Sequence, residues 1–211
     1  MNIIKVILVL FISGIILSLM PFPSVDFINH VLTHRVAYLS NEMTMQSVQQ
    51  LENDMKSLLP GETLDVYINS PGGQIAALAQ LLSIKKIFDV RINAIVVGQN
   101  LAASAAADFL NNADTLDIAD SAIIVYHTGY TCDSTGVFCK RLMINDPDPM
   151  LAAVAQASLE EVKKALKRCI ITKDEFDRVA AGQDVFITGA EANQNMEDCH
   201  PTLLTKLLDA L

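Results

Sequence analysis

The chain has 211 residues, of which 51% are hydrophobic, and its formal net charge at pH 7 is −9. This length suits one domain with a sizeable core. The acidic balance and the lack of a basic cluster in the sequence argue against nucleic acid or anionic lipid as a partner. The four cysteines form no C-x-x-C motif and do not cluster with the four histidines, so we expect no metal site.

The N-terminus carries an uncharged stretch from Val6 to Val25, whose apolar part ends at Met20. Its length fits either the apolar region of a signal peptide or a short membrane helix, and no A-x-A-like cleavage site follows. Lys5 flanks the stretch on its N-terminal side, which favours a cytoplasmic N-terminus. We therefore expect an anchor or signal segment over residues 1–25 and one extracytoplasmic domain over residues 26–211.

The spacing of apolar residues predicts helices that alternate with strands in this domain. In chain order the expected elements are helix 43–59, strand 64–68, helix 75–88, strand 91–98, helix 104–112, strands near 115–119 and 122–127, and a helix over about 150–168. Apolar strands that alternate with helices predict an α/β fold whose mainly parallel sheet is covered by helices.

Ser104 follows the apolar strand and opens an alanine-rich helix. Unpaired amides and the helix dipole favour negative charge at such a junction, which suits a serine nucleophile whose substrate develops an oxyanion. By itself, a serine at this position is more often a helix cap than a nucleophile.

Three further segments carry residues that suit the same chemistry. The diglycine of Asn69-Ser70-Pro71-Gly72-Gly73 exposes backbone amides at a sharp turn. The strand expected near 122–127 delivers His127, and Asp184 precedes Val185-Phe186-Ile187-Thr188 and a helix start at Glu191. Alone, His127 fits a buried core histidine and Asp184 fits a turn or a cap.

Together, and in this order, the four segments resemble the proteolytic subunit of the Clp protease and its relatives, over roughly residues 35 to 200. The resemblance implies a ClpP-type, crotonase-like α/β fold with a projecting helical segment. It implies a serine endopeptidase with Ser104 as nucleophile, His127 as general base and Asp184 as the orienting carboxylate. The amides of Gly73 and Ala105 would form the oxyanion hole, and no cofactor is implied.

The chain also departs from the family pattern. Asn100 replaces a usual glycine, the chain from Gly73 to Ser104 is about two residues longer than usual, and residues 128–149 are unfamiliar. Two alternatives therefore stay open. One is a membrane protease related to signal-peptide peptidases with a Ser104–Lys140 dyad, and the other is a catalytically silent scaffold with this fold.

The resemblance also bears on partners. Relatives assemble as rings through a helix that corresponds to residues 150–168, so we expect a homo-oligomer that acts on peptides or unfolded proteins. An ATPase partner is doubtful for an exported domain, because the usual unfoldases are cytosolic. The spacing of Cys132 and Cys139 would allow a small disulfide-closed loop in an oxidising compartment, with buried thiols as the alternative.

Overall fold

The computed structural model describes residues 34–59, 61–132 and 139–199. Within these ranges no helix is both long and apolar enough to cross a membrane. The stretch from Val6 to Val25, which we expected to form an anchor or signal, lies outside the described residues.

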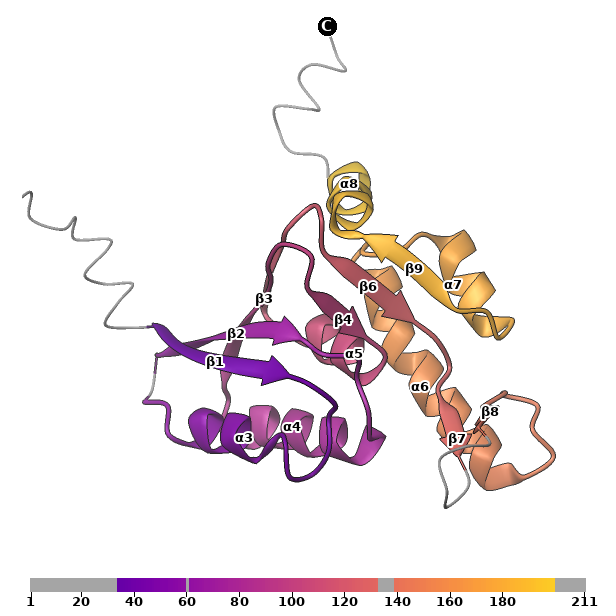
Figure 1. The fold of residues 1–211 in the computed structure, drawn as a ribbon, viewed down its shortest axis with the longest axis horizontal. Coiled ribbons are helices and arrows are strands. Elements are labelled where there is room, and N and C mark those ends of the chain that lie inside the picture. Colours follow the sequence, from indigo (N-terminus) through magenta and orange to yellow (C-terminus); the bar gives the residue numbers. More distant parts are fainter. Residues whose placement is uncertain (1–33, 60, 133–138, 200–211) are drawn as a thin grey trace, which may run out of the picture. The chain divides into compact units, whose positions relative to one another are not determined.

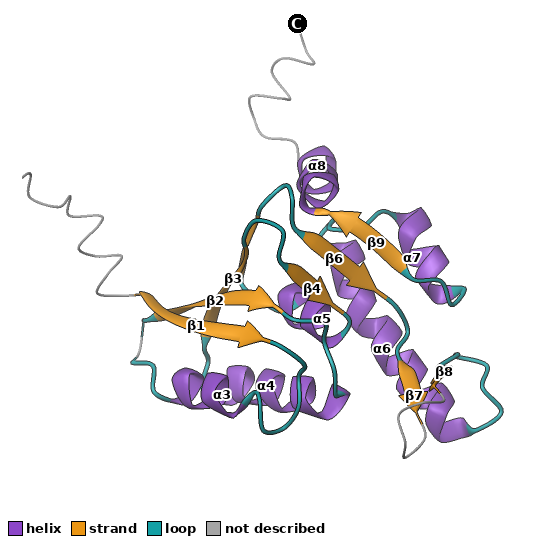
Figure 2. Ribbon diagram, in the orientation of Figure 1, coloured by secondary structure: helices purple, strands orange, loops and turns teal. Residues whose placement is uncertain are grey.

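The first sheet has the strand order β1-β2-β3-β5, and Figures 1 and 2 label the first three of these strands. It comprises β1 (His34–Ser40), β2 (Thr63–Asn69), β3 (Arg91–Val96) and β5 (Thr115–Ile118). β2, β3 and β5 run parallel, with Leu64 paired to Ile92 and Ala94 paired to Leu116. Leu64, Val66 and Ile68 of β2 are fully buried. α3 (Gln49–Lys56) and α4 (Ile75–Ile87) lie along this sheet and contribute Leu51, Met55, Ala77 and Leu81 to the same core.

A second sheet carries the residues of the candidate site. It comprises β4 (Leu101–Ala103), β6 (Ile123–Tyr126) and β9 (Val185–Thr188), with β6 in the centre. β6 runs parallel to β4 and antiparallel to β9. The helices that accompany this sheet are α5 (Ala105–Asn111), α6 (Pro149–Lys167), α7 (Lys173–Ala180) and α8 (Gly189–Cys199).

These elements confirm the predicted α/β fold with a parallel sheet flanked by helices. The helix predicted over 43–59 is shorter in the structure, where α3 begins at Gln49 and ends at Lys56. Met43 instead forms an isolated bridge with Gly73. Thr44 and Ser47 bond each other's backbone, at 2.8 Å from Thr44 N to Ser47 Oγ and 3.0 Å from Ser47 N to Thr44 Oγ1. Such local side-chain bonds compete with helix formation.

The segment after β6 forms a hairpin of β7 (Tyr130–Cys132) and β8 (Cys139–Arg141). Its antiparallel register pairs Tyr130 with Arg141 and Cys132 with Cys139. A disulfide joins these two cysteines, as their spacing allowed. A second disulfide, which we did not predict, joins Cys169 after α6 to Cys199 of α8.

The helix start predicted near Glu191 is confirmed by a capping box. The N–H and hydroxyl of Thr188 donate to Glu191 Oε2 at 2.7 and 2.9 Å, and the Glu191 N–H donates to Thr188 Oγ1 at 3.2 Å. These bonds to the ionised carboxylate lower the pKa of Glu191.

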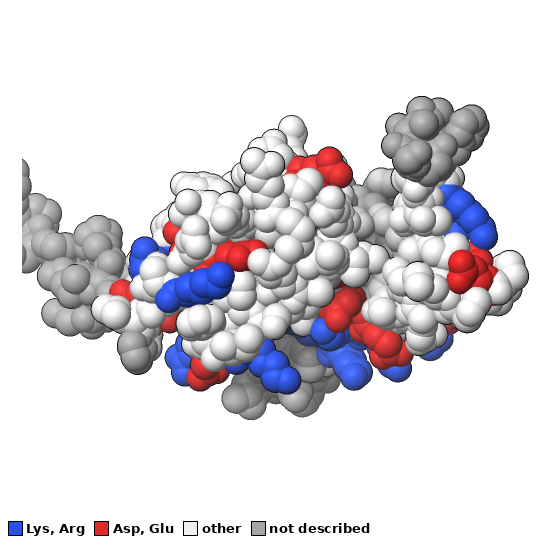
Figure 3. All heavy atoms as spheres, turned by 90° about the horizontal axis from the view of Figure 1, so that it is seen from below, with Lys and Arg blue, Asp and Glu red and all other residues white. Residues whose placement is uncertain are grey.

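Acidic and basic side chains are interspersed on the face drawn in Figure 3. In the described helices several acidic and basic residues form ion pairs one helical turn apart, such as Lys164 with Glu161 and Lys173 with Asp177. This face therefore carries no extended field of one sign.

Candidate active site

The register of the second sheet brings Ser104, His127 and Asp184 to one edge. Ala103 pairs with Val125, so Ser104 lies beside the next residue of β6 and one position short of His127. Tyr126 pairs with Val185 on the antiparallel side, so the continued register sets Asp184 opposite His127. The carboxyl ends of β4 and β6 thus meet the start of β9, and the three predicted site residues come from adjacent strands.

Ser104 occupies a strained junction between β4 and α5. Its backbone has φ 55° and ψ −128°, a region that non-glycine residues rarely adopt. The Ser104 N–H donates to Val125 O at 2.9 Å, and its carbonyl accepts from Asp108 N at 3.0 Å. Among the described residues, no hydrogen bond uses the Ser104 hydroxyl as a cap. A sharp strand-to-helix turn of this kind presents a serine hydroxyl at the top of a sheet.

The Asn-Ser-Pro-Gly-Gly turn is bound directly to the strand that precedes Ser104. Asn69 Oδ1 accepts from Leu101 N at 3.1 Å. Ser70 N donates to Leu101 O at 2.7 Å, and Ala103 N donates to Ser70 O at 3.0 Å. The Ser70 hydroxyl accepts from Gly72 N at 3.1 Å and donates to Asn41 O. The polar residues of this motif therefore set the position of β4.

Gly72 is required by contact as well as by conformation. Its φ is +86°, and a Cβ placed there would lie 2.7 Å from Ser104 Cβ and 2.9 Å from Ala105 N. The sequence directed attention to Gly73 in this diglycine, and it did not single out Gly72. The absence of a side chain at Gly72 lets the turn approach the candidate nucleophile.

Gly73 and Ala105 have amides that suit an oxyanion hole. Met43 N donates to Gly72 O at 2.6 Å, and Gln74 N donates to Met43 O at 2.7 Å. In this parallel bridge the residues on either side of Gly73 form the hydrogen bonds to Met43, and Gly73 itself forms none of them. The Gly73 N–H accordingly points to the opposite side of the turn. Ala105 is the first residue of α5, where amide groups have no acceptor within the helix.

His127 is partly buried directly after β6. The Gly129 N–H donates to His127 Nδ1 at 2.7 Å, which makes Nδ1 the unprotonated nitrogen of the neutral ring. The Tyr130 ring lies against the imidazole, with 5.1 Å between the ring centroids. Burial lowers the pKa of His127; the charge of Asp184 opposes this effect and that of Arg141 adds to it.

Asp184 is paired with the β7–β8 hairpin. Arg141 Nη1 lies 2.9 Å from Asp184 Oδ1, and the Tyr130 hydroxyl donates to the same carboxylate at 3.3 and 3.4 Å. Arg141, followed by the charge of His127 and the Tyr130 hydroxyl, lowers the pKa of Asp184. Within the described residues, neither Ser104–His127 nor His127–Asp184 is joined by a hydrogen bond. The structure brings the three residues to one edge but leaves their side chains unconnected.

Lys140, the alternative base, lies on β8 next to Arg141. Its ammonium group forms an ion pair with Asp146, and its side chain is 59% exposed. In the part of the chain that is described, no hydrogen bond joins Lys140 to Ser104. Arg141 and Tyr130 are the polar residues at this site that the sequence did not indicate, because they belong to the unfamiliar segment that matched no motif.

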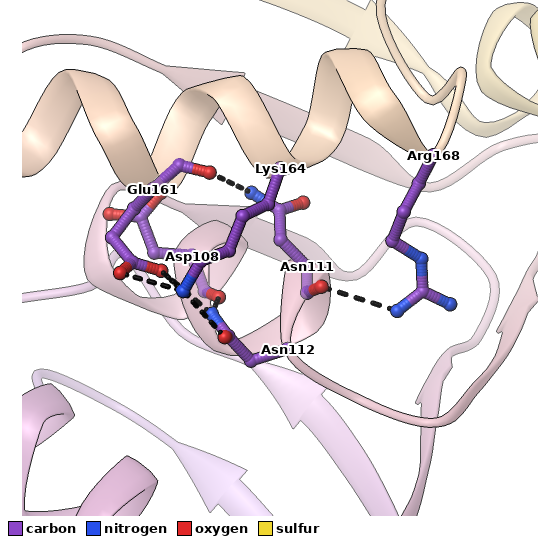
Figure 4. A network of polar contacts seen from close by, with 6 residues as sticks. All are labelled: Asp108, Asn111, Asn112, Glu161, Lys164 and Arg168. Carbon is purple, nitrogen blue, oxygen red and sulfur yellow. Dashed lines mark hydrogen bonds and ion pairs between the residues drawn. The ribbon is translucent and has the colours of Figure 1, made fainter.

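A polar network anchors α5, the helix that begins after Ser104, to α6 (Figure 4). Lys164 donates to both carboxylate oxygens of Glu161 and to Asn112 Oδ1, each within 2.8 Å. Arg168 Nη1 donates to Asn111 O at 3.2 Å. Asp108, one turn after Ser104, is buried beside this network, and burial followed by the charge of Glu161 raises its pKa well above the ordinary value.

The parallel sheet flanked by helices and the Ser104 junction define an α/β protein of the ClpP type. Residues 23–135, more than half of the chain, match the model of the Clp protease family, and the chain belongs to this family. The matched range includes Ser104 and His127 and ends before Asp184. No curated protein was found to match this sequence.

Proposed function

We propose that the protein is a serine endopeptidase that acts through Ser104, His127 and Asp184. The observation that carries this proposal is the strained Ser104 junction, one position short of His127 at the end of the neighbouring strand, with Asp184 opposite His127 in the continued register. Strained backbone of this kind concentrates at active sites, and triads are recognised by geometry rather than by chain order. Membership of the Clp protease family supports the same reaction class.

In the proposed reaction, Ser104 Oγ attacks the carbonyl carbon of a peptide bond while His127 Nε2 takes the hydroxyl proton. The Gly73 and Ala105 amides donate to the oxyanion of the tetrahedral intermediate. The imidazolium returns the proton to the leaving amine, which leaves an acyl-enzyme on Ser104. His127 then takes a proton from a water molecule, which attacks the ester carbonyl. The proton passes to Ser104 Oγ as the carboxylate product leaves. Asp184 would accept a hydrogen bond from the Nδ1–H group and so hold the reactive tautomer.

A fluorophosphonate probe and a fluorogenic peptide test this proposal together. The wild-type chain should be labelled and should cleave peptide, whereas Ser104→Ala should lose both properties and keep its fold. Ser121→Ala is the matched control, because Ser121 is an exposed serine in the turn before β6. Undiminished turnover in Ser104→Ala would eliminate the triad.

The same assay separates the alternatives. An inactive Lys140→Ala variant beside an active His127→Ala variant would establish the Ser–Lys dyad. A wild-type chain that neither reacts with the probe nor cleaves peptide would indicate a silent scaffold.

We also propose that the domain acts outside the cytoplasm, on peptides or unfolded chains and without an ATPase. All four cysteines of the chain are paired, as Cys132–Cys139 and Cys169–Cys199. Structural disulfides are typical of oxidising compartments, and the apolar stretch Val6–Val25 supplies a route of export. A reporter fused after Leu211 should be active only as an extracytoplasmic reporter. Activity of a cytoplasmic reporter would overturn this localisation.

A further inference from the structure

Two residues of the β7–β8 hairpin, Tyr130 and Arg141, bind the Asp184 carboxylate that the proposed triad would use to orient His127. Tyr130 and Arg141 face each other across the hairpin, and the Cys132–Cys139 disulfide closes the same register two pairs away. Arg141 Nη2 donates to the Tyr130 hydroxyl, and its guanidinium carbon lies 4.7 Å from the centre of the Tyr130 ring. The hairpin thus presents a pre-assembled pair of donors to Asp184.

The His127 imidazole, for its part, does not donate a hydrogen bond to Asp184. His127 Nδ1, the nitrogen that a triad requires as a donor to Asp184, accepts a hydrogen bond from the Gly129 N–H instead. The resulting neutral tautomer carries its proton on Nε2, and an Nε2–H group cannot take the proton of Ser104. Both halves of the His127–Asp184 interaction are therefore occupied by other partners.

The Arg141–Asp184 contact is a close ion pair that is not an ideal hydrogen bond. Arg141 Nη1 is buried, and in the described structure no acceptor lies in line with its N–H bonds. The side chain of Asp184 is 35% exposed, where a single ion pair is worth little. A contact of this strength can be exchanged for another at small cost.

We propose that Arg141, with Tyr130, is a positioning residue that competes with His127 for Asp184 and so holds the catalytic groups in a resting arrangement. This inference rests on the proposed peptidase function. In the resting arrangement Asp184 pairs with Arg141, and Nδ1 accepts from Gly129. In the engaged arrangement the imidazole carries its proton on Nδ1, and this N–H donates a hydrogen bond to Asp184, while Nε2 is free to accept the Ser104 proton.

The charged groups that act on His127 are Asp184 and Arg141, from the segment before β9 and from β8, with the Tyr130 ring from β7 packed on the imidazole. Arg141→Met keeps an apolar stem of similar length and removes the guanidinium. Asp184 is then free to accept from the imidazole, which stabilises the imidazolium. We expect the pKa of His127 to rise by about one unit and kcat/KM to rise roughly tenfold.

Lys140→Met is the matched control, since Lys140 is the adjacent hairpin cation and pairs with Asp146 rather than with Asp184. Tyr130→Phe should shift both quantities in the same direction by a smaller factor, because it removes one donor and keeps the ring. Arg141→Lys, which retains the charge, should restore values near those of wild type. Thermal unfolding of each variant monitors the fold.

The imidazole pKa is measured by NMR titration in the Ser104→Ala background, with the His127 signal assigned from its loss in His127→Ala. This readout does not depend on peptidase activity. The charge of Arg141 also lowers this pKa directly, so the titration is read together with the ring ¹⁵N shifts, which report the tautomer. A rise in pKa and a change to the Nδ1–H tautomer in Arg141→Met, with neither in Lys140→Met, supports the competition, even if no variant cleaves peptide and the proposed reaction fails. An unchanged or lowered pKa in a folded Arg141→Met variant overturns the competition. A fall in kcat/KM without a rise in this pKa also overturns it, because Arg141 would then only support Asp184.

Discussion

The pH dependence of the proposed reaction follows from the surroundings of His127. Its pKa lies below the usual 6.5, with burial as the main cause. The neutral imidazole is the base, so the rate should rise with pH through this lowered pKa and stay flat above it. We expect the midpoint of the acid limb of kcat/KM to lie below pH 6.5, with about a tenfold loss for each further pH unit.

Asp184→Asn tests whether the acid limb of kcat/KM arises from the titration of His127. The carboxylate raises the pKa of His127, so its removal should move the midpoint to still lower pH and reduce the rate. An acid limb centred above pH 6.5 in the wild-type chain would contradict the burial of the base.

Gly72→Ala tests the approach of the diglycine turn to Ser104. The new methyl group would meet Ser104 Cβ and the Ala105 backbone, neither of which can move without displacing the start of α5. We expect kcat/KM to fall by about a hundredfold, the scale of a misplaced nucleophile.

Gly61→Ala is the control for this substitution. Gly61 has a similar φ of +91° but nothing lies within 4 Å of the added methyl, so it tests backbone strain alone. Equal activity losses in the two variants would show that the contact with Ser104 is unimportant.

The helix that follows Ser104 contains a buried acid that should make stability depend on pH. Burial raises the pKa of Asp108 above that of the unfolded chain, so its contribution to folding is fullest below about pH 4 and is lost as pH rises toward the folded pKa. Asp108→Asn removes this titration. We expect it to stabilise the fold at pH 7 by about 1 kcal/mol and to flatten the dependence of stability on pH.

Chemical denaturation at several pH values measures this effect. Asp117→Asn is the control, because Asp117 is an exposed acid on β5. A destabilised Asp108→Asn variant at pH 7 would show that Asp108 is charged and stabilised by Lys164.

The molecule as a whole presents apolar side chains that a lone domain leaves exposed. Met150 at the start of α6 is 73% exposed and Phe186 on β9 is 67% exposed. Exposed apolar groups on α6 and β9 suit an interface between copies, which the family resemblance led us to expect for residues 150–168. We expect the full-length chain in detergent to be a homo-oligomer by light scattering, and Met150→Glu to reduce its mass.

Met45→Glu is the matched control, since Met45 is a half-exposed methionine in the turn before α3. A stable monomer that cleaves peptide would exclude an enclosing ring and place the protein nearer to the stand-alone membrane proteases.

Local patterns in the chain were sufficient to predict the bounds of the elements whose apolar residues are regularly spaced. α4, α5 and α6 begin and end within one residue of their predicted bounds, and β2 extends the predicted strand by one residue at each end. The Asn-Ser-Pro-Gly-Gly and Ala-Ala-Ser segments also indicated the candidate nucleophile, because each motif encodes a local backbone requirement. The capping box at Thr188 and Glu191 is local in the same way.

Contacts between distant segments required the folded chain. β4 and β7 have three residues each, too few to show a period, and the antiparallel pairing of β9 depends on where the chain returns after α7. The link from Cys169 to Cys199 spans 30 residues, and sequence spacing does not specify such pairings. Motifs indicated Ser104, His127 and Asp184 as candidates because local chemistry recurs in sequence. The pairing of Asp184 with Arg141 emerged only in three dimensions, because it depends on a hairpin and a sheet edge that meet through long-range packing.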